Sequence, residues 1–214
     1  MKSVSKKGQL SIFIIVGIVI VAAVVFILLY SQGTIRFNSG VTFSPETYLR
    51  ECMQSTIDAT VKTLSAQGGY INPEGYILYK DEKIKYLCYT SDYYETCIMQ
   101  QPMIKNHFEQ ELKNNIRSQA ENCYNQLIEE YQKQDYTVNS EKPNVNVFFI
   151  PKNMRIDFSA SLTISKDSET IRFDKIEVSQ PSELYNLLMI SESILEFEVV
   201  YGDSETTLYM QYYP

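Results

Sequence analysis

Three apolar patterns follow one another along the chain. Leu10–Tyr30 is a continuous apolar run without a charged residue. In two stretches between residues 45 and 134, apolar residues recur at intervals of three and four, the period of an amphipathic helix. From Val145 onwards apolar and polar residues alternate, the period of a half-buried strand. This order predicts a membrane helix, then a helical part, then a β-rich part.

Two soluble helices are predicted from their end signals. Ser44-Pro45-Glu46 offers an N-cap serine, a proline at the first helical position and an acid in the first turn, and Gln67-Gly68-Gly69 predicts the end of this helix. A long helix follows Pro102 and is expected to end near Gln134. The apolar positions of the first are Leu49, Met53, Ile57, Val61 and Leu64, and those of the second are Ile104, Phe108, Leu112, Ile116, Ala120, Cys123, Leu127 and Tyr131.

Strands are predicted between and after these helices. Tyr76–Tyr79 and Ile84–Tyr89 read as a hairpin around a polar loop. Met154–Ile164 alternates most regularly. Ile171 and Phe173 are at odd positions, whereas Ile176 and Val178 are at even positions, so a regular strand would place the two pairs on opposite faces. A single strand with all four on one face needs a bulge near Asp174-Lys175.

The C-terminal residues are expected to form a short helix and a last hairpin. Pro181-Ser182 opens the short helix. Phe197–Tyr201 and Thr207–Tyr212 are predicted as the two strands of the hairpin, around the turn at Gly202–Glu205.

The predicted fold class is α+β. A single N-terminal transmembrane helix precedes a helix–hairpin–long helix unit and a mostly antiparallel sheet. The expected parts are a cytoplasmic basic segment (1–9), a transmembrane helix (10–30), a linker (31–44), a helix–hairpin–helix part of the ectodomain (45–135) and a β-rich part of the ectodomain (136–214).

The membrane assignment follows from length and flanking charge. About 20 apolar residues span a bilayer core as a helix, and Leu10–Tyr30 is long enough. Lys2, Lys6 and Lys7 precede the run, which predicts a cytoplasmic N-terminus and an outer position for Ser31–Pro214. A cleaved secretory signal is the alternative, but its apolar region is shorter.

The charge balance narrows the class of partner. The net charge is −7, and three of the bases lie before the apolar run, so the rest of the chain is strongly acidic. An acidic surface argues against nucleic acid as a partner. No small-molecule substrate is evident, which leaves a protein partner or self-association.

The four cysteines all lie in the predicted outer part, where disulfides persist, and they allow three pairings. Cys52 and Cys123 lie on the apolar sides of the two helices, which favours bridges Cys52–Cys123 and Cys88–Cys97. The cysteines contain no C-x-x-C spacing, so neither a zinc site nor another cofactor is expected.

Candidate catalytic chemistry is sparse. His107 is the sole histidine and lies within the long helical pattern, where a helix-surface residue is the simpler interpretation. The sequence lacks phosphate-binding, dinucleotide-binding, zinc-protease, serine-hydrolase and EF-hand motifs. The chain is therefore expected not to be an enzyme, and no catalytic, cofactor-binding or metal-binding residue is assigned.

Tyrosine is abundant, with 17 residues against no tryptophan. Tyrosine suits half-buried strands, and it also offers a rigid contact area with a polar tip. A cluster around the first hairpin is a possible recognition surface: Tyr70, Tyr76, Tyr79, Tyr86, Tyr89, Tyr93 and Tyr94.

At the N-terminus Lys6-Lys7 is followed by the small residue Gly8, then by Gln9 and a long apolar helix. This segment resembles the class III signal segment of archaeal type IV pilin-like proteins. The resemblance implies cleavage after Gly8, with Gln9 as the first mature residue. In this family a glutamate usually stands about five residues into the mature chain, and Phe13 occupies that place here.

Further short marks are Glu51-Cys52, the stretch from Gln67 to Ile71, and Asn122-Cys123 on a long helix before alternating strands. With them, the chain from about Lys6 to Leu188 looks like membrane-anchored surface proteins common in small-genome archaea. The resemblance implies no catalytic residues, and the function of that group is not established.

The sequence therefore predicts a single-pass protein of the cell membrane. Its disulfide-stapled ectodomain is expected to have a structural or interaction role. A pilin-like subunit of a surface filament or secretion-type assembly, processed after Gly8, is the alternative. An extracytoplasmic enzyme is a third possibility for which no site is visible.

Overall fold

The computed structural model describes residues 16–17, 19–21 and 44–212. The chain divides into two compact units, Met1–Thr42 and Phe43–Pro214. In the first unit the described positions 16–17 and 19–21 are helical. No helix among the described residues is long and apolar enough to cross a membrane. The rest of Leu10–Tyr30, together with Gly8 and Gln9, lies outside the described residues, so the membrane helix and its processing stay predictions.

Helix α2 (Pro45–Ala66) begins and ends where its end signals predict. The Ser44 side chain accepts the Thr47 N–H, and Pro45 occupies the first turn. Gly68 takes the left-handed conformation that terminates helices, with φ +70°. The residues that α2 buries completely are Leu49, Met53, Ile57 and Leu64.

The segment between the helices forms two small antiparallel pairs. In the first, β1 (Tyr76–Tyr79) pairs with β2 (Glu82–Lys85) across a turn in which Lys80 and Asp81 both have positive φ. In the second, β3 (Cys88–Tyr89) pairs with β4 (Ile98–Met99). The predicted strand Ile84–Tyr89 is therefore wrong as a unit, because its two ends pair with different partners.

Helix α3 (Ile104–Lys133) spans the predicted long helix without interruption. Its buried stripe packs against α2, and the disulfide Cys52–Cys123 joins the two helices with their Cα atoms 5.9 Å apart. A second disulfide, Cys88–Cys97, joins β3 to the residue before β4. This is the pairing that the sequence favours.

One antiparallel sheet follows the helices. Its strands are β5 (Thr137–Ser140), β6 (Asn144–Ile150), β7 (Asn153–Lys166) and β8 (Glu169–Pro181). β7 is central: β5 and β6 pair with successive parts of one of its edges, and β8 pairs with the other edge. The mixed helical and antiparallel architecture is α+β, as predicted.

The sheet has an irregularity halfway along β7. The register with β8 shifts between Ser159 and Leu162, opposite Lys175 and Phe173, which confirms the predicted bulge. The extra residue lies on β7 rather than β8. On the other edge of β7, the gap between β5 and β6 lies beside the same residues. There the Glu141 N–H donates to the Ser161 carbonyl at 3.1 Å.

The C-terminal hairpin prediction is wrong. Helix α4 (Leu184–Tyr201) runs through the first predicted strand, Phe197–Tyr201, and α5 (Thr206–Tyr212) occupies the second, Thr207–Tyr212. Aromatic and β-branched residues favour strands, but here the helical period prevails and Gly202 ends α4 with φ +74°.

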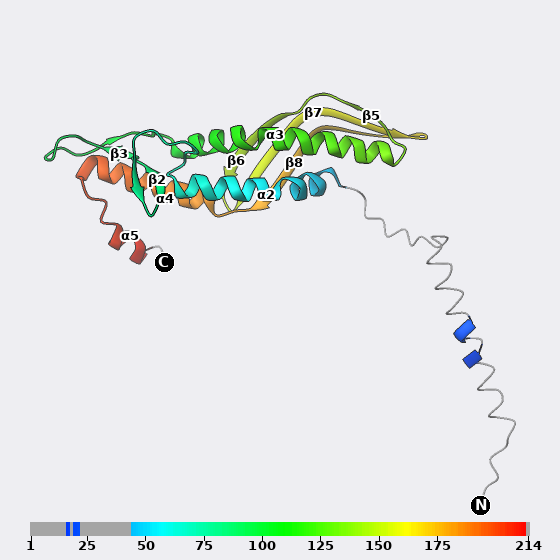
Figure 1. Cartoon of the computed structure of the whole chain (residues 1–214), viewed down its shortest axis with the longest axis horizontal. Helices are drawn as coiled ribbons and strands as arrows, with labels where there is room; N and C mark the ends of the chain where they lie inside the picture. The colour runs from blue at the N-terminus through cyan, green and yellow to red at the C-terminus, as the bar shows by residue number, and fades with distance from the viewer. Residues whose placement is uncertain (1–15, 18, 22–43, 213–214) are drawn as a thin grey trace, which may run out of the picture. The chain divides into compact units, whose positions relative to one another are not determined.

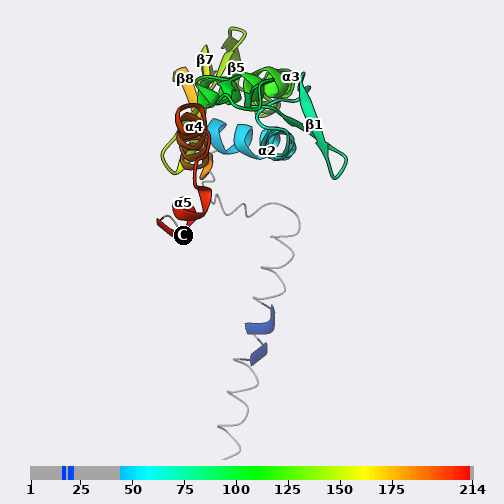
Figure 2. The same ribbon diagram turned by 90° about the vertical axis from the view of Figure 1, so that its left-hand side faces the viewer.

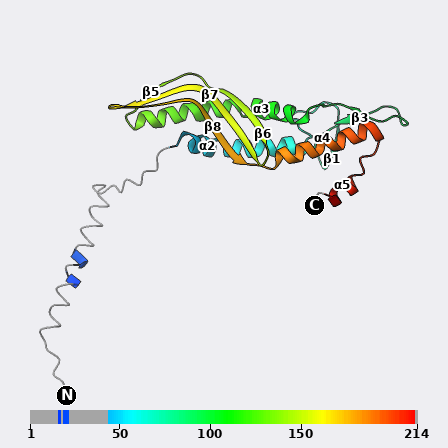
Figure 3. The same cartoon turned by 180° about the vertical axis from the view of Figure 1, so that it is seen from behind.

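Phe43–Pro214 has two layers. Helices α2 and α3 pack side by side against one face of the sheet, α2 towards β8 and α3 towards β6 (Figures 1 and 2). Seen from behind, the strands cross in front of both helices with no described element over them (Figure 3). The helical part and the β-rich part thus share a single core.

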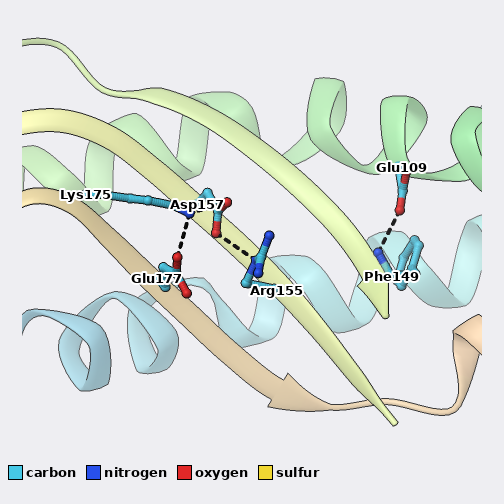
Figure 4. A network of polar contacts seen from close by, with 6 residues as sticks. All are labelled: Glu109, Phe149, Arg155, Asp157, Lys175 and Glu177. Carbon is cyan, nitrogen blue, oxygen red and sulfur yellow. Dashed lines mark hydrogen bonds and ion pairs between the residues drawn. The ribbon is translucent and has the colours of Figure 1, made fainter. Parts of the chain in front are cut away.

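Helix α3 also covers the outer edge of β6. Buried Glu109 accepts the Phe149 N–H at 2.7 Å and pairs with Lys105 at 2.8 Å (Figure 4). Further along, Lys113 Nζ donates to Asn146 Oδ1 at 2.9 Å. Because unpaired strand edges invite pairing with other chains, these contacts protect the edge of the sheet.

The Glu109 contact is testable by substitution. We expect Glu109→Ala to lower the free energy of unfolding by about 1–3 kcal/mol, because it leaves the buried Phe149 N–H without an acceptor. Glu109→Gln keeps an acceptor oxygen and should lose less. Urea unfolding measures both variants. Unfolding of Glu109→Ala at the wild-type urea concentration would contradict this role.

Candidate functional site

Most of the predicted tyrosine cluster lies on the surface, on the β1–β2 hairpin and on the loop that the Cys88–Cys97 disulfide closes. Tyr79 is 57 % exposed and Tyr94 is 84 % exposed. We call this set the tyrosine surface, and its exposed members are Tyr76, Tyr79, Tyr86, Tyr89, Tyr93 and Tyr94. The hairpin adds the exposed aliphatic side chains of Ile77 and Leu78.

Tyr70 differs from the other members of the cluster. Its hydroxyl donates to Gln101 Oε1 at 2.5 Å, and its ring lies 4.1 Å from the His107 ring. Burial, followed by the nearby Glu111 carboxylate, raises the pKa of Tyr70. Tyr70 therefore supports the segment between α2 and α3 instead of belonging to the exposed surface.

Part of the tyrosine surface is concave. Tyr76, Tyr86 and Tyr89 border a hollow of about 270 Å³, with Lys85 and Gln100 completing its wall. The Tyr86 and Tyr89 rings lie 5.5 Å apart. The hollow can receive an apolar or aromatic side chain, with hydroxyl groups available at its rim.

Lysine side chains lie over several of the exposed rings. Lys83 Nζ is 5.0 Å from the Tyr76 ring centre, and Lys80 Nζ is 5.2 Å from that of Tyr79. A cation at this distance is attracted to the ring face. These contacts favour particular rotamers of the Tyr76 and Tyr79 side chains.

The outer edge of β1 offers backbone groups as well. Tyr79 and Glu82 flank the two-residue turn and form the first hydrogen-bonded pair of the hairpin. Hydrogen-bonded and non-hydrogen-bonded pairs alternate from there along the two strands. The N–H and C=O groups of Tyr76 and Leu78 therefore point away from β2. The same alternation turns Lys85 outward on β2, where its N–H donates to the Gln67 carbonyl at 3.4 Å. Among the described residues no backbone hydrogen bond reaches the outer edge of β1.

His107 lies beneath this region, half-buried between Tyr70 and Gly69. Its Nε2 atom is buried without a hydrogen-bond partner among the described residues. All four cysteines are in disulfides, so no thiol is available to pair with the imidazole. The arrangement is that of a packing residue.

A second polar group lies on the sheet face that turns away from the helices. Buried Asp157 pairs with Arg155 at 3.1 Å and with Lys175 at 2.9 Å, and Lys175 reaches Glu177 at 2.5 Å (Figure 4). Hydrogen bonds to Asp157 and Glu177 raise the pKa of Lys175, and Lys175 lowers the pKa of Glu177. Each carboxylate lies beside a cation, and the group joins β7 to β8.

Sequence reasoning missed one exposed apolar feature, the outward side of α4. Leu187, Phe197 and Tyr201 are exposed there, and Leu188 is the buried residue of the helix. The signal was present as apolar residues at intervals of three and four from Leu187 to Tyr201. It was obscured because Phe197–Tyr201 also reads as a strand.

Neither a metal-ligand cluster among the described residues nor a similar known protein identifies a function. Within the described part of the chain, no three His, Cys, Asp or Glu side chains converge as metal ligands would. Comparison of the chain with protein-family models, with curated protein sequences and with solved structures finds no match. The candidate site therefore rests on geometry alone.

The packing of His107 predicts a pH dependence of stability. Burial lowers the pKa of His107. Lys85 adds to this effect, while the Glu111 carboxylate and the Gly69 backbone oppose it. The unfolded chain thus takes up this proton at a higher pH than the folded chain does. The contribution of neutral, packed His107 to the free energy of unfolding is therefore present above the ordinary histidine pKa of about 6.5, and it is lost as the pH falls below that value.

Urea unfolding between pH 7 and pH 5 measures this dependence. We expect the free energy of unfolding to fall over this range, and to fall less in His107→Gln. The carboxylates titrate in both proteins, so the difference between the two pH profiles isolates the effect of His107. Identical pH profiles for the two proteins would contradict the assignment.

Proposed function

We propose that the chain is a single-pass membrane-anchored protein whose outer domain binds a partner protein through the tyrosine surface. The observation that carries the proposal is the exposure of six tyrosines, together with Ile77 and Leu78, on one hairpin, one disulfide-closed loop and the link between them. Large exposed apolar groups of this kind mark interaction sites, and tyrosine is enriched in them.

The two disulfides fit a stabilised extracellular domain, because such bonds persist in oxidising surroundings. The uncharged run Leu10–Tyr30 is preceded by Lys2, Lys6 and Lys7, and the first base after it is Arg36. This charge pattern supports the membrane anchor and the outward position of the domain.

The position of the tyrosine surface also suits an anchored receptor or adhesin-like role. Within Phe43–Pro214, α2 runs from Pro45 towards the β1–β2 hairpin and the Cys88–Cys97 loop (Figure 1). An anchor that precedes Pro45 is joined to the opposite end of α2, about 33 Å away along the helix axis. The tyrosine surface is thus presented at the end of the domain that is remote from its attachment.

The free edge of β1 suggests how a partner is held. An extended segment that pairs with this edge would use the outward groups of Tyr76 and Leu78 as backbone partners. Its side chains would meet the tyrosine hollow on one side of the hairpin. Binding is proposed rather than catalysis, since His107 is packed against Tyr70 and the cysteines are oxidised.

Site-specific photo-cross-linking in intact cells tests the proposal. Benzoylphenylalanine at position 79 or 94 should give a discrete adduct with a second protein. The matched control is the same group at exposed Thr170 of β8, away from the hairpin, which should give none. Equal labelling from all three positions would contradict the tyrosine surface.

Protease treatment of the same cells tests the topology separately. The outer position predicts digestion of Phe43–Pro214 in intact cells once the disulfides are reduced. Complete protection would place the domain on the other side of the membrane and contradict this part of the proposal.

A further inference from the structure

Strand β1 combines a free outer edge with a sequence that contains no charged residue. Every residue of Tyr76–Tyr79 is exposed, and Leu78 is 65 % exposed. The other edge of the hairpin is covered, because the Lys85 N–H of β2 donates to the Gln67 carbonyl at the end of α2. Figure 2 shows the hairpin projecting beyond α2 and α3. An extended chain can therefore approach β1 along its whole length.

The strands at the margins of the large sheet are protected against such pairing, and β1 is not. Charged residues and prolines on an edge strand prevent it from pairing with another chain. The β6 edge is covered by Glu109 of α3. The marginal strand β8 carries charges along its length, at Arg172, Asp174, Lys175 and Glu177. With neither a charge nor a proline, β1 is suited to pairing with a second strand.

The directions of the backbone groups restrict how a strand can pair with β1. The Tyr86 N–H donates to the Gly75 carbonyl at 3.1 Å, in agreement with a ladder in which the odd-numbered residues of β1 face β2. Tyr76 and Leu78 therefore offer the outward groups. An antiparallel partner must supply two outward residues with the same spacing. β1 of a second copy supplies them.

A two-fold axis through Ile77 pairs all of these groups. It sets Tyr76 opposite Leu78 of the second copy, and Leu78 opposite its Tyr76. Each of these pairs exchanges two hydrogen bonds. Ile77 then faces Ile77 of the second copy in a non-hydrogen-bonded pair, where side chains approach most closely. The exposed apolar residues of both strands thus cover one another.

Neighbouring registers use the edge less well. An axis at Tyr76 would pair Leu78 with Glu74, whose carbonyl already accepts a hydrogen bond from Lys85 Nζ. An axis at Leu78 would pair Tyr76 with Lys80, which has left the strand with φ 49°. The axis through Ile77 is therefore the register that the backbone favours.

The charges beside β1 also favour a second copy. Glu74 comes just before the strand and Lys80 just after it, and both side chains are exposed. Within the described part of the chain neither of them forms an ion pair. In an antiparallel pair the start of one strand lies beside the end of the other, so Glu74 of each copy approaches Lys80 of the other. Opposite charges placed in this way stabilise strand pairing.

We propose that the partner at the β1 edge is a second copy of this chain, bound by antiparallel pairing of the two β1 strands. The inference rests on the proposed function, because it identifies the protein that occupies this part of the tyrosine surface. The pairing joins two hairpins into one sheet with the order β2–β1–β1–β2. A two-stranded hairpin is marginally stable by itself, so the wider sheet stabilises both copies.

Disulfide formation at position 77 tests the pairing in the full chain, in detergent micelles. The axis brings the two Cα atoms at this position to about 4.5 Å, which a disulfide can span. On mild oxidation Ile77→Cys should give a dimer linked from 77 to 77, with the native disulfides intact by peptide mass mapping. The matched control is Ile171→Cys on β8, since Ile171 is 49 % exposed and Ile77 is 50 % exposed. The control should form dimers about tenfold more slowly, because only chance collisions bring its thiols together.

Equal rates of dimer formation in Ile77→Cys and Ile171→Cys would overturn the inference. The cross-linking experiment in intact cells separates this failure from that of the proposed function. A benzoylphenylalanine adduct from position 79 with a different protein, without a dimer of Ile77→Cys, would overturn the pairing of two copies and still support the tyrosine surface as a binding site.

The orientation is tested by reversing charges in the Ile77→Cys protein at low ionic strength. Glu74→Lys or Lys80→Glu alone sets like charges beside each other and should slow dimer formation about threefold or more. The two changes together should restore the rate. An in-register parallel pair already sets like charges beside each other. Equal rates for the single charge variants and Ile77→Cys alone would therefore contradict the antiparallel arrangement.

Discussion

The structure of Phe43–Pro214 depends on the pairing of α2 with α3, which the Cys52–Cys123 disulfide makes permanent. The two cysteines are separated by 71 residues, and closing a loop of that length in the unfolded chain corresponds to about 4 kcal/mol in the chain-entropy model. The helices bury Leu49, Met53 and Ile57 against the α3 stripe and present a joint apolar surface to the sheet. The sheet packs on this surface, and its β6 edge is closed by Glu109 from the same helix pair.

The same staple explains how the candidate site can be apolar and still ordered. The segment between α2 and α3 contains only four short strands in two separate pairs, and a two-stranded hairpin alone is marginally stable. Both of its ends are fixed by helices that cannot separate, and the Cys88–Cys97 bridge closes its outer loop. Tyr70 and His107 fasten its base. The exposed tyrosines are therefore held by the surrounding constraints and are not needed for the core.

Much of the fold could be predicted because strong local signals agree with the packing. The caps of α2, the period of α3 and the alternation of β7 each have one interpretation. Prediction fails where two interpretations compete. Phe197–Tyr201 suits a strand by composition and a helix by spacing. The helix forms because Leu188 and Leu195, on the same helix, pack against the core. The sequence also located the tyrosine surface. It did not indicate that Tyr70 is half-buried, which depends on contacts with Gln101 and His107 from distant positions. The exposed apolar side of α4 was missed because the predicted short helix stopped before Phe197–Tyr201, which was assigned to a strand.

Two covalent links hold this arrangement, one between α2 and α3 and a separate one that closes the tyrosine loop. Mass mapping of peptides from the non-reduced, full-length protein tests this most directly. We expect one linked pair that contains Cys52 and Cys123 and another that contains Cys88 and Cys97, with no free thiol. A link from Cys52 to Cys88 or Cys97, or a free thiol at Cys123, would contradict the helix pairing on which the rest of the structure depends.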